Sequence, residues 1–171
     1  MEITDMNQIT EKLYLGNMYA AFNKKKLEFL KINKVLTVMG NFGNHYPKNT
    51  IIHKIIDIED SINSNIIQYF KECLYFIDGN NKVLVHCAAG ISRSATIVIA
   101  YIMWKQKKTY VEARKFVASK RKVIAPNIGF VEQLRLFDDL LRKHNYDLDK
   151  IDFTRIKIKP VNTNGLVCNI M

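Results

Sequence analysis

A chain of 171 residues, 48% of them hydrophobic, is long enough for one domain with a buried core. The longest apolar run, 95–104, is too short to cross a bilayer, and the N-terminus lacks a signal-peptide pattern, so we expect a cytosolic or nuclear protein. Three cysteines without a Cys-x-x-Cys pair argue against a disulfide framework or a zinc site. The formal net charge of +10 fits both an anion-binding surface and solvated lysine-rich helix faces.

Strand and helix patterns alternate along the chain. The expected strands are a pair within 8–16, then 34–39, 51–56 and 83–86. The expected helices are 20–22, 27–30, 64–78 with Ser64 as its cap, 95–104, 109–120 with a capping box, and 128–144. This alternation predicts an α/β fold in which helices flank a central, mostly parallel sheet.

The segment 83–94 carries the most specific chemistry. A predicted buried strand turns through small residues into a predicted helix, whose N-terminus offers free N–H groups and partial positive charge. Cys87 opens the turn, where these groups and Arg93 favour a thiolate. The planar fork of Arg93 suits bidentate binding of phosphate. We therefore expect in-line attack by sulfur on phosphorus, with Ser94 donating a hydrogen bond that helps the sulfur leave.

These residues match a known signature. The stretch is His86-Cys87-Ala88-Ala89-Gly90-Ile91-Ser92-Arg93-Ser94. It resembles the His-Cys-x-x-Gly-x-x-Arg-Ser/Thr motif of cysteine-based protein phosphatases, and its Ser-Arg-Ser-Ala ending is similar to the dual-specificity branch. Residues 9–16, Arg121 and 126–134 extend the resemblance over roughly residues 7 to 143.

The resemblance implies a protein tyrosine phosphatase-like fold and a catalytic domain over residues 1–145. It implies that residues 87–93, here called the cysteine loop, bind phosphate. It also implies that no metal or other cofactor takes part. His86 is similar to the family histidine that supports the loop. Asn127 is interpreted either as a helix cap or as a partner of the loop.

A general acid is expected at the end of the strand 51–56, where Asp57, Glu59 and Asp60 lie. Alternation along an extended run puts Asp57 and Glu59 on one face, with Asp60 starting the loop beyond, so spacing alone leaves the choice open. Alignment with the family pattern favours Asp60 over Asp57, and Glu59 is interpreted as a solvated turn residue. A mobile loop position also suits proton transfer.

The variable positions of the cysteine loop indicate the substrate. None of them is charged, whereas related phosphoinositide phosphatases often place lysine there, and related RNA 5′-triphosphatases carry different residues around the arginine. The resemblance therefore favours phosphoproteins bearing phosphotyrosine, phosphoserine or phosphothreonine over lipids or nucleic acid. A phospho-binding module without catalysis is the alternative from another class.

Residues 146–171 are expected to form a flexible basic tail. The chain ends Cys168-Asn169-Ile170-Met171, which fits a prenylation box, although Asn169 is not aliphatic. A basic run over 154–160 could supply the second signal for binding the inner leaflet of a membrane. The alternative interpretation is a chance cysteine in a disordered tail.

Overall fold

A five-stranded sheet lies between two groups of helices in the computed structural model, which describes residues 4–43, 45–47 and 50–158. The strands are β1 (Met6–Gln8), β2 (Leu13–Gly16), β3 (Ile32–Val38), β4 (Ile52–Ile56) and β5 (Lys82–His86). Their order is β1-β2-β5-β3-β4; β1 pairs with β2 in antiparallel fashion, and the other pairings are parallel. The prediction of a mostly parallel sheet is confirmed.

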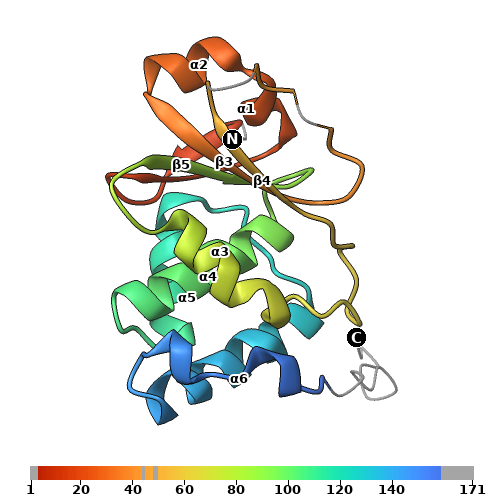
Figure 1. Ribbon diagram of the computed structural model, residues 1–171, viewed down its shortest axis with the longest axis vertical. Coiled ribbons are helices and arrows are strands. Elements are labelled where there is room, and N and C mark those ends of the chain that lie inside the picture. The colour runs from red at the N-terminus through yellow and green to blue at the C-terminus, as the bar shows by residue number, and fades with distance from the viewer. Residues whose placement is uncertain (1–3, 44, 48–49, 159–171) are drawn as a thin grey trace, which may run out of the picture.

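Helices cover both sides of this sheet. Helices α1 and α2 lie on one side, and α3, α4, α5 and α6 gather on the other (Figure 1). Their bounds are α1 (Met18–Phe22), α2 (Lys24–Phe29), α3 (Phe70–Ile77), α4 (Arg93–Lys105), α5 (Tyr110–Lys120) and α6 (Ile128–Lys143). Within the described ranges, no helix combines the length and apolar character needed to cross a membrane.

Alternation along the central strands divides the interior into two cores. Leu84 faces the core under α1 and α2, while Val83 and Val85 face the larger core under α3 to α6. All three side chains are at most 1% exposed. Helix α4 is buried along residues 94–100, which places it at the centre of the larger core. The turn from β5 into α4 is therefore anchored by buried elements on both sides.

The helix predicted over 64–78 begins later than expected. A 3-10 turn, η1 (Ile67–Tyr69), precedes α3, and Ser64 does not cap it. Instead, Gln133 on α6 accepts hydrogen bonds from the backbone N–H groups of Ile66 and Ile67 at 2.8 and 3.0 Å. The helix N-terminus is thus satisfied by a residue distant in the sequence, which local cap patterns do not reveal.

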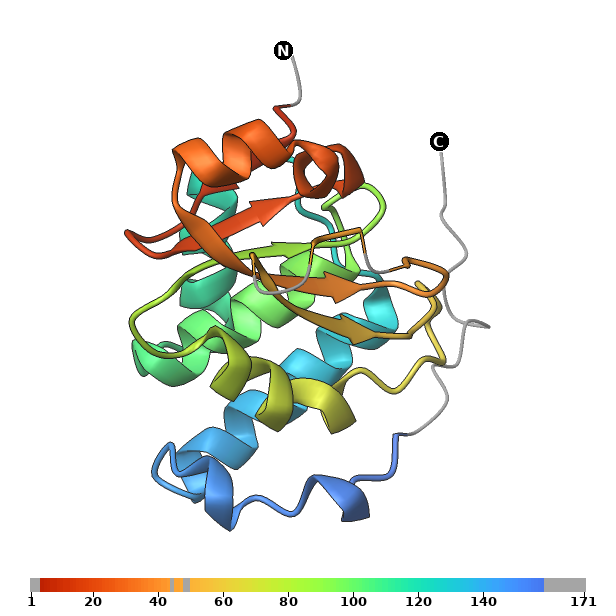
Figure 2. The same ribbon diagram turned by 45° about the horizontal axis from the view of Figure 1, so that its top comes forward.

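The packed domain continues beyond residue 145, where the flexible tail was expected to begin. Two further 3-10 turns, η2 (Leu148–Lys150) and η3 (Phe153–Arg155), lie at the bottom of Figure 2. Leu148, Ile151 and Phe153 are buried in the larger core at 2%, 4% and 7% exposure. Apolar residues without helical periodicity hold this segment against the core, and the partly buried Ile156 and Ile158 continue the contact. Cys168 and the rest of the predicted box lie outside the described residues.

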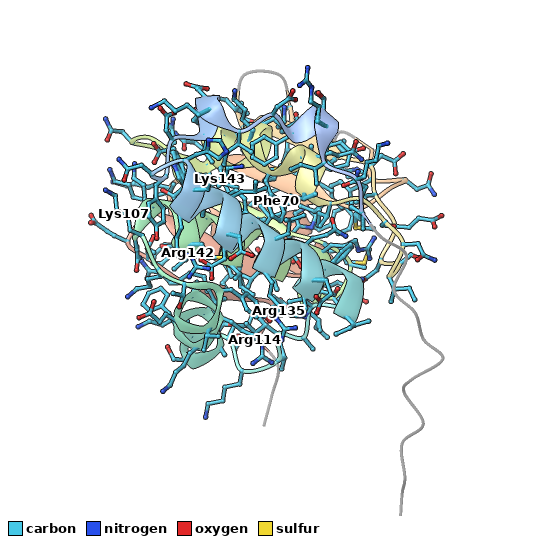
Figure 3. The ribbon with its side chains drawn as sticks, turned by 90° about the horizontal axis from the view of Figure 1, so that it is seen from below. Phe70, Lys107, Arg114, Arg135, Arg142 and Lys143 are labelled. Atoms are coloured by element: carbon cyan, nitrogen blue, oxygen red, sulfur yellow. The ribbon has the colours of Figure 1, made fainter. Side chains whose placement is uncertain are left out.

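Basic side chains gather on the face formed by α5, α6 and the turn after α4. Figure 3 shows Lys107, Arg114, Arg135, Arg142 and Lys143 on this face. Arg135 pairs with Glu132 and Arg142 pairs with Asp139, both at 2.7 Å. Part of the positive charge is thus neutralised locally, as on an ordinary solvated helix face. Lys107 and Arg142 also lie at the ends of α4 and α6 that are remote from the cysteine loop.

Candidate active site

The cysteine loop joins β5, which ends at His86, to α4, which begins at Arg93. Cys87 is 1% exposed, and its Sγ accepts hydrogen bonds from the Gly90 N–H at 3.2 Å and the Ser94 Oγ–H at 3.1 Å. A donor from the middle of the loop and a donor from the first turn of α4 therefore converge on the sulfur, where they stabilise negative charge. The predicted contact between Ser94 and Cys87 is present.

The carbonyl groups of residues 88–91 all point out of the loop, where each accepts a hydrogen bond. The donors are Met18 N for Ala88 (3.1 Å), Arg121 Nη2 for Ala89 (3.3 Å), Arg121 Nε for Gly90 (2.9 Å) and Ala125 N for Ile91 (2.9 Å). A carbonyl and the N–H of the next residue point in opposite directions across a planar trans peptide. The amides of residues 89–92 consequently face the interior of the loop and form a cradle for an anion.

Arg121 is the largest fully buried side chain in the described part of the molecule, at 2% exposure. Besides its two bonds to the cysteine loop, its Nη1 donates to the Thr4 carbonyl at 2.9 Å and to Asn7 Oδ1 at 2.7 Å. Burial lowers the pKa of this guanidinium, while the nearby Cys87 and Asp5 raise it. Arg121 therefore ties the back of the loop to the N-terminal segment.

Gly90 adopts a left-handed backbone conformation with φ of +69°. A Cβ at this position would clash with the Gly16 carbonyl oxygen and approach Arg121 Nη2 to 2.9 Å. The loop can make this turn only because the position carries no side chain. Two features thus explain the glycine of the sequence motif: the positive φ of Gly90 and the close approach of the Gly16 backbone.

Arg93 lies at the mouth of the cradle, with its side chain 15% exposed. One Nη1–H donates to the Ile58 carbonyl at 3.3 Å, which orients the guanidinium. Its buried Nε has no hydrogen-bond partner among the described residues and lies 3.6 Å from Asp60 Oδ2. The remaining donors of Arg93 are therefore available for an oxyanion.

Asp60 reaches the cysteine loop, and Asp57 does not. Asp60 Oδ1 accepts hydrogen bonds from Ser92 Oγ at 2.7 Å and from Asn127 Nδ2 at 2.8 Å. The carboxylate of Asp57 packs instead against the Cα of Gly40. Of the two aspartates considered from the sequence, Asp60 is therefore the one that the described contacts place beside Ser92 and Arg93.

Asn127 has both of the interactions considered for it. Its Oδ1 accepts from the Phe130 N–H at 3.0 Å and caps α6, while its Nδ2 holds Asp60. Its backbone N–H also donates to Ser92 Oγ at 3.1 Å. The N-terminus of α6 thereby fixes the acid and the last turn of the loop together.

His86 is fully buried beneath the loop. Its Nδ1 lies 3.3 Å from the Cys87 carbonyl oxygen, and its Nε2 lies 2.7 Å from Thr37 Oγ1. Burial lowers the pKa of His86 to about 4; a hydrogen bond to the Cys87 backbone opposes this shift, and His53 adds to it. The imidazole is therefore neutral at pH 7 and supports the loop by hydrogen bonding.

Three contributors to the site were not predicted from the sequence: Thr37, the side chain of Ser92, and the role of Arg121 as a clamp on the loop. Thr37 is a polar residue within the apolar run of β3, and this was the one local signal that could have pointed to it. Arg121 and Ser92 act through long-range contacts, which sequence spacing does not encode.

Comparison with known proteins gives consistent matches. The family model described as "Dual specificity phosphatase, catalytic domain" matches residues 13–139. Dual specificity protein phosphatase 1 of Arabidopsis thaliana is 40% identical over 131 residues, covering 74% of this chain and 66% of that protein. MAP kinase phosphatase with leucine-rich repeats protein 1 of Dictyostelium discoideum is 46% identical over 138 residues, covering 79% of this chain and 16% of that protein.

A solved structure shares the fold. The human tyrosine phosphatase-like serine/threonine/tyrosine-interacting protein superposes with a TM-score of 0.75 at 35% identity, covering 80% of this chain and 97% of that chain. This chain spans less than two thirds of the length of the two relatives above, so the similarity concerns only a part of each.

Proposed function

The chain belongs to the dual-specificity phosphatase family, and on that premise we propose that it hydrolyses phosphotyrosine, phosphoserine and phosphothreonine esters of proteins through a cysteinyl-phosphate intermediate. The observation that carries this proposal is the inward-facing cradle of amides around Cys87, created by four outward-held carbonyls. A cradle of this kind is suited to the oxygens of a phosphoryl group.

In the first step, Cys87 Sγ attacks phosphorus as the bond from phosphorus to the substrate oxygen breaks. The guanidinium of Arg93 and the amides of the cradle bind the equatorial oxygens, where negative charge is spread in the transition state. Asp60, in its protonated form, gives its proton to the leaving oxygen. This assignment is supported by the contacts of Asp60 with Ser92 and Asn127 beside the loop.

In the second step, water attacks the phosphocysteine and the bond between phosphorus and sulfur breaks. Asp60, now ionised, accepts a proton from that water, which restores its starting state. The hydroxyl of Ser94, 3.1 Å from the sulfur, stabilises the thiolate as it leaves. Inorganic phosphate is released, and no external oxidant or cofactor is needed for the balance.

The preference for protein substrates rests on the side chains around the cradle. Ala88, Ala89 and Ile91 carry no charge that could bind further phosphates of an inositol lipid or a nucleotide. Together with the family match, this favours a phosphoprotein carrying one phosphoryl group at the site.

A phosphate-release assay tests the proposal. The wild-type protein and Cys87→Ser are compared on phosphotyrosine and phosphothreonine peptides, an inositol phospholipid and triphosphate-ended RNA. We expect release from the peptides by the wild type alone. Tight phosphopeptide binding without release would indicate a binding module, and preferential release from lipid or RNA would reassign the substrate.

The C-terminal sequence supports a second, separate proposal about location. We propose that Cys168 is farnesylated, because the last four residues fit a prenylation box that ends in Met, and that the preceding basic run adds attraction to anionic lipids of the inner leaflet. Without this modification, we expect the protein to distribute between cytosol and nucleus. Intact-mass measurement after expression in a prenylating cell tests the modification, and an unmodified full-length protein would contradict it.

A further inference from the structure

Thr37 joins two histidines within the sheet. It lies on β3, is fully buried, and stands directly opposite His86 of β5 in the parallel register. Its Oγ1 lies 2.7 Å from His86 Nε2 and 2.8 Å from Nε2 of His53, which belongs to the edge strand β4. One hydroxyl therefore connects the edge of the sheet to the histidine beneath the cysteine loop.

The direction of these hydrogen bonds follows from the chemistry of the groups. The carbonyl of Cys87 can only accept, so the neutral imidazole of His86 must carry its proton on Nδ1 and keep a lone pair on Nε2. The hydroxyl of Thr37 must then donate to His86 Nε2. Since that hydroxyl has a single proton, its oxygen must accept from His53, which requires a proton on Nε2 of His53.

Aromatic packing restricts the rings to these positions. The Phe42 ring packs edge-on against His86 at 4.9 Å between centroids and against His53 at 5.9 Å. Tyr46 packs edge-on against His53 at 5.0 Å. The imidazoles are thus held by their faces and edges, while the hydrogen bonds select the tautomers.

We propose that Thr37 and His53 are positioning residues that hold His86, and through it the first peptide of the cysteine loop, in the geometry needed for attack by Cys87. In this chain of hydrogen bonds, His53 Nε2–H donates to Thr37 Oγ1, and the Thr37 hydroxyl donates to His86 Nε2. His86 Nδ1–H then donates to the Cys87 carbonyl. This proposal rests on the proposed phosphatase function for its kinetic consequence, but not for its structural one.

Two matched pairs of variants separate hydrogen bonding from packing. Thr37→Val keeps the branched shape and removes the hydroxyl, while Thr37→Ser keeps the hydroxyl. His53→Phe keeps a ring against Phe42 and removes the donor, while His53→Gln supplies an amide N–H near the position of Nε2. Thermal melting of all four variants establishes which of them fold.

The structural test is nitrogen NMR of the full-length protein without ligand at pH 7. We expect His86 to be protonated on Nδ1 and His53 to be fixed as the Nε2–H tautomer, in the wild type and in Thr37→Ser. In Thr37→Val, His53 should lose its fixed tautomer. A proton on Nδ1 of His53 in the wild type, or a tautomer indifferent to Thr37→Val, would overturn the proposal whether or not the protein has activity.

The kinetic test uses an aryl phosphate. Losing the net free energy of one neutral hydrogen bond lowers a rate constant by roughly twofold to tenfold. We therefore expect kcat to fall about tenfold in Thr37→Val and about threefold in His53→Phe, with KM within about twofold of the wild-type value. Thr37→Ser and His53→Gln should stay within about twofold of the wild type. Equal losses in both members of each folded pair would refute a positioning role through hydrogen bonds.

Discussion

Replacing Arg121 with methionine tests whether the cysteine loop is held from behind. This side chain is 2% exposed and donates to four acceptors: the carbonyls of Gly90, Ala89 and Thr4, and Asn7 Oδ1. Methionine fills much of the volume but leaves these acceptors unpaired in the interior. A buried acceptor left unpaired costs about 1 to 3 kcal/mol, so we expect a net loss of roughly 3 to 5 kcal/mol after partial relaxation, which for a chain of this size lowers Tm by roughly 10 °C.

The same change should impair catalysis beyond its effect on stability. Without Arg121, the carbonyls of Ala89 and Gly90 are free to turn, and the cradle amides of residues 90 and 91, which belong to the same peptides, lose their inward orientation. We expect kcat/KM on an aryl phosphate to fall about 100-fold at a temperature well below the melting transition. Calorimetry and steady-state kinetics measure the two effects on the same samples.

Arg135→Met is the matched control, since Arg135 lies on the surface of α6 with its side chain 59% exposed. We expect its Tm to stay within about 2 °C of the wild type, with unchanged activity. The reasoning fails if Arg121→Met melts like this control. A folded but destabilised Arg121→Met protein with full activity would show that the clamp stabilises the domain without shaping the cradle.

Three further predictions concern the acid, the glycine turn and pH. Asp60→Asn should slow hydrolysis of a phosphotyrosine peptide about 100-fold or more, but should slow hydrolysis of an activated nitrophenyl phosphate far less, because only the poor leaving group needs a proton. Asp57→Asn is the control. An equal loss of rate on both substrates in Asp60→Asn would assign the acid role to another residue. Gly90→Ala should lower both Tm and kcat/KM because its Cβ would clash with the Gly16 carbonyl. Gly79→Ala should leave activity unchanged, because Gly79 also has a positive φ but has nothing within 4 Å of an added Cβ. Full activity in Gly90→Ala would contradict this reasoning. Burial lowers the pKa of His86 from 6.5 to about 4, so the native state binds fewer protons than the unfolded chain between these values. Its contribution to stability is complete above pH 6.5 and falls by about 1.4 kcal/mol per pH unit below it; denaturant titrations at pH 7, 6 and 5 measure this slope, and a flat profile would refute it.

The sequence predicts the parts of this site that are local. The cysteine loop could be predicted because a strand, a glycine turn and a helix start follow one another within residues 86–94, and each leaves a residue-type pattern. The capping box of α5, between Thr109 and Glu112, is confirmed for the same reason. The mostly parallel pairing of the sheet also follows from the alternation of strands with helices, but the order of its strands does not.

Contacts between distant segments could not be predicted in the same way. The choice between Asp57 and Asp60 depends on where Asn127 and Ser92 lie in space, which alternation along one strand does not determine. Gln133 of α6 accepts the hydrogen bonds that satisfy the N-terminus of η1, and these two elements are far apart in the sequence. Arg121, Thr37 and His53 likewise act on the cysteine loop only after the sheet has brought them to it.

The covalent intermediate is the central claim, and rapid-quench mass spectrometry tests it most directly. The full-length Ser94→Ala variant is mixed with a phosphotyrosine peptide, quenched within milliseconds and digested, because slower release of the thiolate should let the intermediate accumulate. We predict one phosphoryl group on the peptide that contains Cys87, in an amount that approaches one per enzyme molecule. Phosphate release at an undiminished rate with no phosphoryl group on Cys87, or with the group on another residue, would contradict the account.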